Sequence, residues 1–195
     1  MSSKLLQKVF LITAVLFLSG CAFTTGHVDL QYQPASAGTK IATAQSPRVA
    51  LKIIDKRSTQ IVGSKINGFG MKTADIVSDS DVPATLKTAF ETELENRGFK
   101  LGPNGLVLVV ELRNLQNQFA LGFFSGESTG SVGMEVTIER PDGAKIYNQY
   151  ITGQGQDSIE LADMSNAQKT LDAAIENAVS KTFNDSAFIE ALQRS

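Results

Sequence analysis

The chain of 195 residues contains one cysteine, one histidine and no tryptophan. One cysteine and one histidine leave little for metal chemistry or for Cys–His catalysis. The histidine, His27, lies in a polar stretch near the N-terminus, where we expect a solvated residue rather than a ligand or a catalytic base. The formal charge of −2 leaves no basic surface for nucleic acid, so we expect no nucleic-acid partner.

An apolar run near the N-terminus is too short to cross a bilayer. It covers residues 9–18 and follows Lys4 and Lys8. Ten residues rise about 15 Å as a helix, half of the ~30 Å of a hydrocarbon core. The run therefore predicts a signal peptide over residues 1–20.

The four residues after this run resemble the bacterial lipobox. They read Leu18-Ser19-Gly20-Cys21. In a lipobox the small residues suit the peptidase, and the cysteine thiol carries diacylglycerol and becomes the mature N-terminus. An ordinary secretory cleavage beside a chance cysteine is the alternative. The resemblance implies a covalent diacylglycerol and an N-acyl chain (palmitate) on Cys21, with no other cofactor and no metal.

The residue after the cysteine bears on sorting. In enterobacterial-type sorting an aspartate at this position retains the protein in the inner membrane, and here the residue is Ala22. The resemblance therefore favours an outer-membrane lipoprotein that faces the periplasm. Several acyl chains, at about 0.8 kcal/mol per buried CH₂, hold a protein to a bilayer essentially permanently.

Composition divides the mature chain into a tether and one domain. Residues 21–47 are rich in small and polar residues and are expected to form the lipidated N-terminus and a flexible tether. Alternation within this stretch favours a short edge strand over residues 28–33. Regular patterning starts at Arg48, so residues 48–195 are expected to form a single periplasmic domain.

Periodicity in the domain predicts strands and helices of an α+β fold. Strands are expected from residue 49 to Asp55 and over residues 106–112, with hairpins over residues 59–78 around Asn67-Gly68 and over residues 131–154. A helix opens at Pro83, and a second one has a capping box that begins with Ser165. The order predicts a two-layer sandwich, a mostly antiparallel sheet with two amphipathic helices on one face. One core is expected to join apolar residues of both helices and of the central strand, namely Phe90, Leu94, Leu171, Ile175, Leu108 and Val110.

Several short motifs resemble the YajG-like bacterial lipoproteins, over nearly the whole chain. Besides the lipobox, they are Asp55-Lys56-Arg57-Ser58, Arg97-Gly98-Phe99, Gly102-Pro103-Asn104-Gly105 and the segment from Asp185 to Leu192. The turn at residues 102–105, with the Arg-Gly-Phe before it, is the most specific of these. The resemblance implies an envelope lipoprotein with an α+β periplasmic domain, and it carries over no catalytic residue.

Three functions fit the sequence. The first is a non-enzymatic binding or accessory module for an envelope partner, which is a protein, peptidoglycan or lipid, with the membrane contacted through the lipid anchor. The second is a cell-wall glycan hydrolase, which needs two carboxylates across a cleft. Its candidates are Asp55, Glu111 and Asp157, although a local ion pair or solvation explains each of them more simply. The third is a lipid carrier with a pocket between helices and sheet.

A phenylalanine-rich stretch is the candidate interaction surface. Phe119, Phe123 and Phe124 fall within six residues, just before a Gly- and Ser-rich segment. A strand that buries Phe119 and Phe123 is the structural interpretation. Because aromatic residues dominate binding hot spots, the functional interpretation is an anchor for a partner or for the bilayer.

Overall fold

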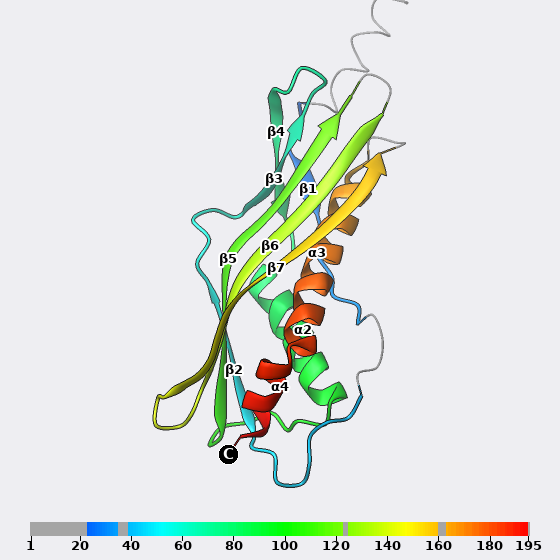
Figure 1. Cartoon of the computed structure of the whole chain (residues 1–195). Helices are drawn as coiled ribbons and strands as arrows, with labels where there is room; N and C mark the ends of the chain where they lie inside the picture. Colours follow the sequence, from blue (N-terminus) through cyan, green and yellow to red (C-terminus); the bar gives the residue numbers. More distant parts are fainter. Residues whose placement is uncertain (1–22, 35–38, 123–124, 160–162, 195) are drawn as a thin grey trace, which may run out of the picture.

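The computed structural model describes residues 23–34, 39–122, 125–159 and 163–194, which form a mixed α+β fold (Figure 1). Within them, seven strands make one open sheet and three helices accompany it. The strands are β1 (Gly26–Val28), β2 (Val49–Asp55), β3 (Ile61–Ile66), β4 (Lys72–Ser78), β5 (Leu106–Leu121), β6 (Gly126–Glu139) and β7 (Lys145–Ile159). The helices are α2 (Val82–Asn96), α3 (Met164–Asn184) and α4 (Ser186–Gln193).

The sheet is mixed, with both parallel and antiparallel strand pairs. The strand order is β1-β4-β3-β5-β6-β7, and β2 also pairs with β5. Within the described chain, three of the six pairings are parallel: β1 with β4, β2 with β5 and β3 with β5. The parallel pairing of β2 with β5 arises because α2 lies between them in the chain and returns it to the same end of the sheet.

Strands β2 and β3 lie end to end along one edge of β5. Residues of β2 pair with 106–112 of β5, and residues of β3 pair with 117–120. The other edge of β5 pairs with β6 over its whole length, through a hairpin whose described ends are Leu121 and Gly126. Because β3 and β5 are parallel, the β3–β4 loop and the β5–β6 turn lie at the same end of the sheet (Figure 1).

Aspartates start all three described helices. Asp81 caps α2 by accepting from the N–H of Ala84, and Gly98 follows the helix with φ +88°. Asp185 caps α4 by accepting from the N–H of Ala187. At α3 the N-cap is Asp163 and not the predicted Ser165, whose N–H the Asp163 carboxylate accepts. The third helix, α4, buries Phe188 and Leu192, so the helices that pack on the sheet number three instead of two.

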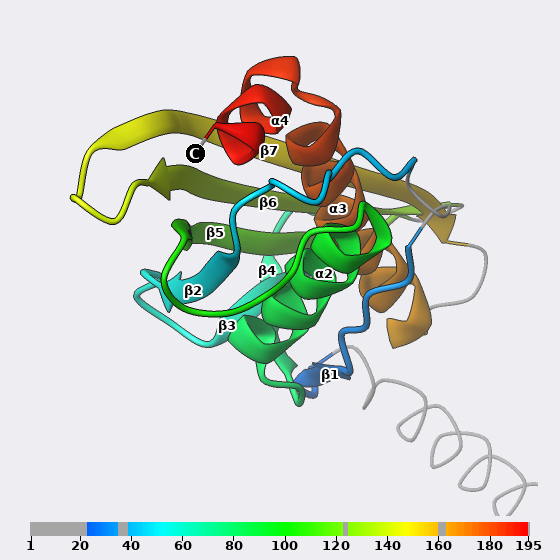
Figure 2. The ribbon, with the colours of Figure 1, turned by 90° about the horizontal axis from the view of Figure 1, so that it is seen from below.

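Helix α3 lies directly on a strip of glycines in β6 and β7. A Cβ added to Gly153 would lie 1.9 Å from the carbonyl oxygen of Ala174, and one added to Gly130 would lie 2.2 Å from that of Thr170. Helices α2 and α3 run side by side along the sheet (Figure 2). The predicted core residues of both helices and of β5 are fully buried in one cluster: Phe90, Leu94, Leu171, Ile175, Leu108 and Val110.

The N-terminal stretch expected to be a tether is bound to the domain. Its strand β1 covers residues 26–28 rather than 28–33 and extends the sheet by pairing with β4. Val28 and Leu30 are buried in the core. The folded unit therefore begins well before residue 48, because alternating apolar residues of this stretch pack between the sheet and α3.

Candidate functional site

Of the three phenylalanines predicted as an interaction surface, Phe119 lies within the described residues. Phe119 is 1% exposed and belongs to the core, so it is not part of an interaction surface. It lies in β5 between Lys65 of β3 and Ser128 of β6, on the sheet face that packs against the helices. Cys21, Phe123 and Phe124 lie outside the described residues.

The three carboxylates considered for hydrolysis stand apart, each in an ion pair with a basic residue. Asp55 accepts from Arg57 at 2.8 Å, Asp157 accepts from Lys169 at 3.0 Å, and Glu111 pairs with Arg113. The hydrogen bond from Arg57 lowers the pKa of Asp55, and the one from Lys169 lowers the pKa of Asp157. A glycosidase acid needs a raised pKa, so this arrangement does not provide one at these positions.

Two carboxyl groups with raised pKa values lie on α3, and neither was among the site residues predicted from the sequence. Desolvation raises the pKa of Asp172 to about 6, and it also raises the pKa of Glu176. Both accept hydrogen bonds from the extended N-terminal segment: the N–H of Gln31 donates to Asp172 at 3.0 Å, and the backbone of Gln33 donates to Glu176. These groups hold the chain and do not face each other across a cleft.

The contacts of this segment, residues 26–33, follow from helix and strand dimensions. The N–H of Asp29 donates to Gln168, so every second residue of the segment meets every fourth residue of α3. Four helical residues rise about 6 Å and two extended residues about 6.6 Å, so the two spacings match. Tyr32 adds a hydrogen bond of 2.7 Å to Glu93 of α2. We call residues 26–33 the strap.

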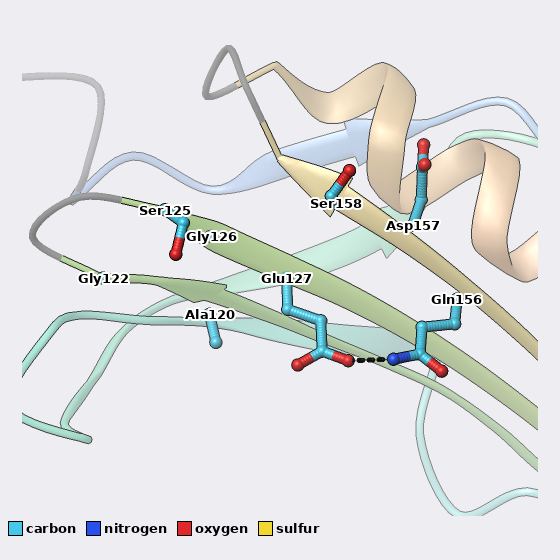
Figure 3. A pocket seen from close by; sticks show the side chains of 8 residues that line it. All are labelled: Ala120, Gly122, Ser125, Gly126, Glu127, Gln156, Asp157 and Ser158. Atoms are coloured by element: carbon cyan, nitrogen blue, oxygen red, sulfur yellow. Dashed lines mark hydrogen bonds between the residues drawn. The ribbon is translucent and has the colours of Figure 1, made fainter.

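A polar pocket lies at the end of β5, β6 and β7 (Figure 3). It has a volume of about 780 Å³. Its lining residues are Ala120, Gly122, Ser125, Gly126, Glu127, Gln156, Asp157 and Ser158. Glu127 accepts a hydrogen bond from Gln156, as the dashed line shows. The pocket can bind hydrogen-bonding groups, and the described residues that line it include no histidine, cysteine or lysine to serve as a nucleophile or base.

Metal binding, membrane spanning and lipid carriage were also considered for the part of the chain that the structure describes. No group of three or more His, Cys, Asp or Glu residues there could hold a metal ion. No helix within the described ranges is long and apolar enough to cross a membrane. The core contains tightly packed rings, such as Phe90 and Phe183 with centroids 5.7 Å apart, where a lipid carrier would need a cavity.

Strand β7 forms an edge of the described sheet, with β6 as its strand neighbour. Asn148, Gln149 and Tyr150 are all exposed, so both faces of the strand are accessible at its middle. Between Lys145 and Asp157 the strand contains no charged residue and no proline.

One side of this edge is hollowed. A groove of about 590 Å³ lies between Gln154 of β7 and residues of α3 that include Asn177 and Lys181. Lys181 donates to the carbonyl of Thr152 at 2.9 Å, which shows that this carbonyl points away from β6. The edge therefore offers backbone hydrogen-bonding groups and a groove beside them.

An anchored envelope protein is the class that these observations and the comparisons define. A family model described as "Uncharacterized lipoprotein" matches residues 34–193. The chain belongs to this family of bacterial lipoproteins, which implies a membrane-anchored location in the cell envelope. A comparison with curated proteins finds no match.

The comparison with solved structures finds similar chains at low sequence identity. A Xanthomonas campestris protein of the DUF330 family is 11% identical with a TM-score of 0.57, over 86% of this chain and 96% of that one. A minor lipoprotein from Acinetobacter baumannii is 14% identical with a TM-score of 0.45, over 72% of this chain and 90% of that one. At these identities the first likeness concerns the fold alone.

Proposed function

We propose that this chain is a non-enzymatic, lipid-anchored module at the periplasmic face of the outer membrane, of the YajG-like kind. It binds an extended segment of an envelope protein along the free edge of β7. The observation that carries the proposal is the unpaired edge of β7, where three successive side chains at residues 148–150 face solvent and none of the strand's own residues 146–156 is charged.

A long edge strand whose own residues 146–156 include no charge and no proline favours pairing with a partner. Soluble proteins protect edge strands with lysines, prolines, bulges or short lengths, because a bare edge pairs with other chains. Strand addition uses such an edge: backbone hydrogen bonds supply affinity, and alternate side chains supply specificity. The groove beside Gln154 gives those side chains a place on the α3 side. Residues 146–156 of β7 are uncharged, whereas the groove also contains Glu176, Lys181 and Asp185, so this edge suits an extended protein segment with polar side chains towards α3.

The anchor follows from the lipobox and from family membership. Cys21 carries a diacylglycerol and an N-acyl chain in this proposal, and Ala22 directs the protein to the outer membrane. Lack of catalysis is supported by the ion pairs of Asp55, Glu111 and Asp157, which place no raised-pKa acid opposite a second carboxylate. Purified protein should therefore release no soluble fragments from peptidoglycan.

Lipid attachment is tested by Cys21→Ser. The variant should accumulate as an unprocessed or soluble precursor and should lack the added acyl mass of the wild type. Membrane fractionation and intact-mass spectrometry measure both properties. Wild-type fractionation and mass in the variant would remove Cys21 as the anchor.

The edge is tested by photocrosslinking in cells. A photoreactive amino acid replaces Gln149 in the middle of β7, and the matched control replaces Thr88, an exposed residue of α2. Position 149 should give a discrete protein adduct that mass spectrometry identifies, and position 88 should not. Adducts of equal yield at both positions, or none at 149 in a folded and anchored protein, contradict the edge as the binding surface. A glycan adduct would replace the protein partner by peptidoglycan.

A further inference from the structure

Three large apolar side chains are exposed at one end of the molecule. Among the described residues, the large hydrophobic side chains exposed by more than half are Phe23 (69%), Phe69 (76%), Met71 (59%) and Tyr150 (57%). Phe69 and Met71 lie in the β3–β4 loop, and Tyr150 lies in the middle of β7. Singly exposed apolar residues need no explanation, but a group at one end marks an interaction site.

Register and a hydrogen bond place Phe23 near the β3–β4 loop. Strand β1 runs parallel to β4, and Gly26 pairs with Ile76, so the residues before Gly26 lead back towards Lys72 and the loop. Lys65, the residue before the last one of β3, donates to the carbonyl of Thr24 at 2.9 Å. Figure 1 shows β1 and the β3–β4 loop at the same end of the sheet.

The loop itself, residues 67–71, is held in one shape. The side-chain oxygen of Asn67 accepts from the N–H groups of Phe69 and Met71, both at 3.0 Å. Gly70 has φ +78°, which a glycine adopts without strain. Residues 67–71 include no carboxylate. An ordered loop thus presents two apolar side chains outward, without a negative charge that would oppose contact with lipid.

The short stretch of chain between Cys21 and Phe23 keeps the proposed lipid anchor near the end of the molecule that carries Phe69 and Met71. Cys21 precedes Phe23 by two residues, which span about 7 Å at most. The strap keeps the rest of the N-terminal segment on the domain, through β1, the buried Leu30 and the contacts of Gln31 with α3. The lipid-bearing residue therefore stays beside the exposed end.

We propose that the β3–β4 loop inserts Phe69 and Met71 into the bilayer that holds the lipid anchor. The proposal rests on lipid attachment at Cys21, as given under the proposed function. The loop acts as a second contact: the acyl chains retain the protein, and the apolar loop fixes its orientation so that the sheet stands up from the membrane. Amphipathic surfaces bind at the headgroup boundary in this way.

The absence of tryptophan makes the test direct. Phe69→Trp and Tyr150→Trp each yield a full-length, lipidated protein with a single tryptophan, and Phe23→Trp is a third reporter next to the anchor. Each protein is reconstituted into phosphatidylethanolamine and phosphatidylglycerol vesicles with and without brominated acyl chains. Flotation reports anchoring, and the melting temperature confirms folding. Tryptophan emission should shift to the blue and be quenched by brominated lipid at position 69 and at position 23, and it should remain unquenched at position 150.

Each outcome decides between the loop and the anchor. Vesicle flotation with quenching at 23 but none at 69 overturns loop insertion and leaves the anchor intact. Flotation without quenching at either position does the same. Equal quenching at 69 and 150 overturns the upright orientation and with it the proposal. A protein that does not float refutes lipid attachment and removes the ground of the loop proposal as well.

Discussion

The contact between α3 and the glycine strip predicts a large effect for Gly153→Ala. In a strand interior, Gly→Ala without steric conflict stabilises a protein by about 0.5–1 kcal/mol, because glycine loses more conformational freedom on folding. Here the added Cβ would lie 1.9 Å from the carbonyl oxygen of Ala174 and 2.9 Å from the Cβ of Ala178. The nearest obstacle is helix backbone, so no side-chain rotation relieves it and α3 must move off the sheet.

The expected magnitude follows from the cost of overpacking. Added methyl groups in well-packed cores cost about 1–3 kcal/mol, occasionally more. Because α3 also makes contacts through Leu171 and Ile175 that a shift weakens, we expect about 3 kcal/mol. For a domain of this size that loss lowers the melting temperature by roughly 6–12 °C. Thermal unfolding followed by circular dichroism measures it.

Matched variants separate the steric effect from a general one. Thr152→Ala changes the exposed neighbour in β7 and should move the melting temperature by little. Ala178→Gly in the Gly153→Ala background removes the Cβ of residue 178 but leaves the carbonyl of Ala174, so it should not restore stability. A Gly153→Ala protein as stable as the parent would refute the close packing of α3 on β7.

Three further predictions concern the core and the carboxylates. Phe90→Ala should cost about 3–5 kcal/mol, measured by chemical denaturation, because the ring is fully buried; an unchanged midpoint would contradict this. Asp55→Asn should cost about 3 kcal/mol because it leaves the 7%-exposed side chain of Arg57 unpaired, and a peptidoglycan release assay should show no activity in variant or parent. The raised pKa of Asp172 means that this carboxyl makes the domain less stable as pH rises from about 4 to about 6, with Glu176 acting in the same direction. Asp172→Asn should therefore raise the melting temperature at pH 7 and flatten its dependence over that range; an equally steep profile would contradict the assignment.

Local patterns predicted the elements where apolar periodicity was uninterrupted. The central strand was expected over residues 106–112, and it continues to Leu121. A bulge explains the difference: the register shifts between Leu112 and Asn114, so Arg113 and Asn114 are both exposed before alternation resumes at Leu115. A strict period of two breaks at that point, so the second half of the strand was not recognised.

Long-range pairing could not be predicted from the same patterns. Nothing in the sequence of β2 or β3 states that both lie along one edge of β5, since parallel pairing depends on the connections. The role of the glycines in β6 and β7 could not be predicted either, because it depends on the close packing of α3 against these strands. At α3, Asp163 and Ser165 are both good N-cap residues, and a capping box favoured the wrong one.

The prediction that residues 26–33 belong to a flexible tether was wrong for a related reason. The polar composition of the strap is typical of a tether, and its acceptors Gln168, Asp172 and Glu176 lie about 140 residues further along the chain. The signal was present on α3, where these three residues recur every four positions and line one helix face. This pattern on α3 indicates a binding site only when an extended segment whose N–H groups need acceptors lies beside the helix, and the sequence does not show which segment that is. The candidate edge of β7 was missed similarly, because exposure of an edge is a property of the whole sheet.

The strap, the loop and the edge together define an orientation. Strand β5, with 16 residues, is about 50 Å long, and its end at Leu121 lies beside the β3–β4 loop. With that loop at the bilayer, β7 stands along the membrane normal and offers its exposed middle some tens of ångströms above the surface. A partner segment that pairs with β7 then also runs along the normal, as a chain would when it extends between the membrane and the periplasm. Release of the strap would replace this fixed height by a free stretch of up to about 65 Å from residues 22–40, because Ile41 and Ala42 are held separately by the carbonyl of Arg97. In the proposed arrangement, the strap, through β1, Leu30 and the contacts of Gln31 and Gln33 with α3, sets the distance between the membrane and a partner bound at β7.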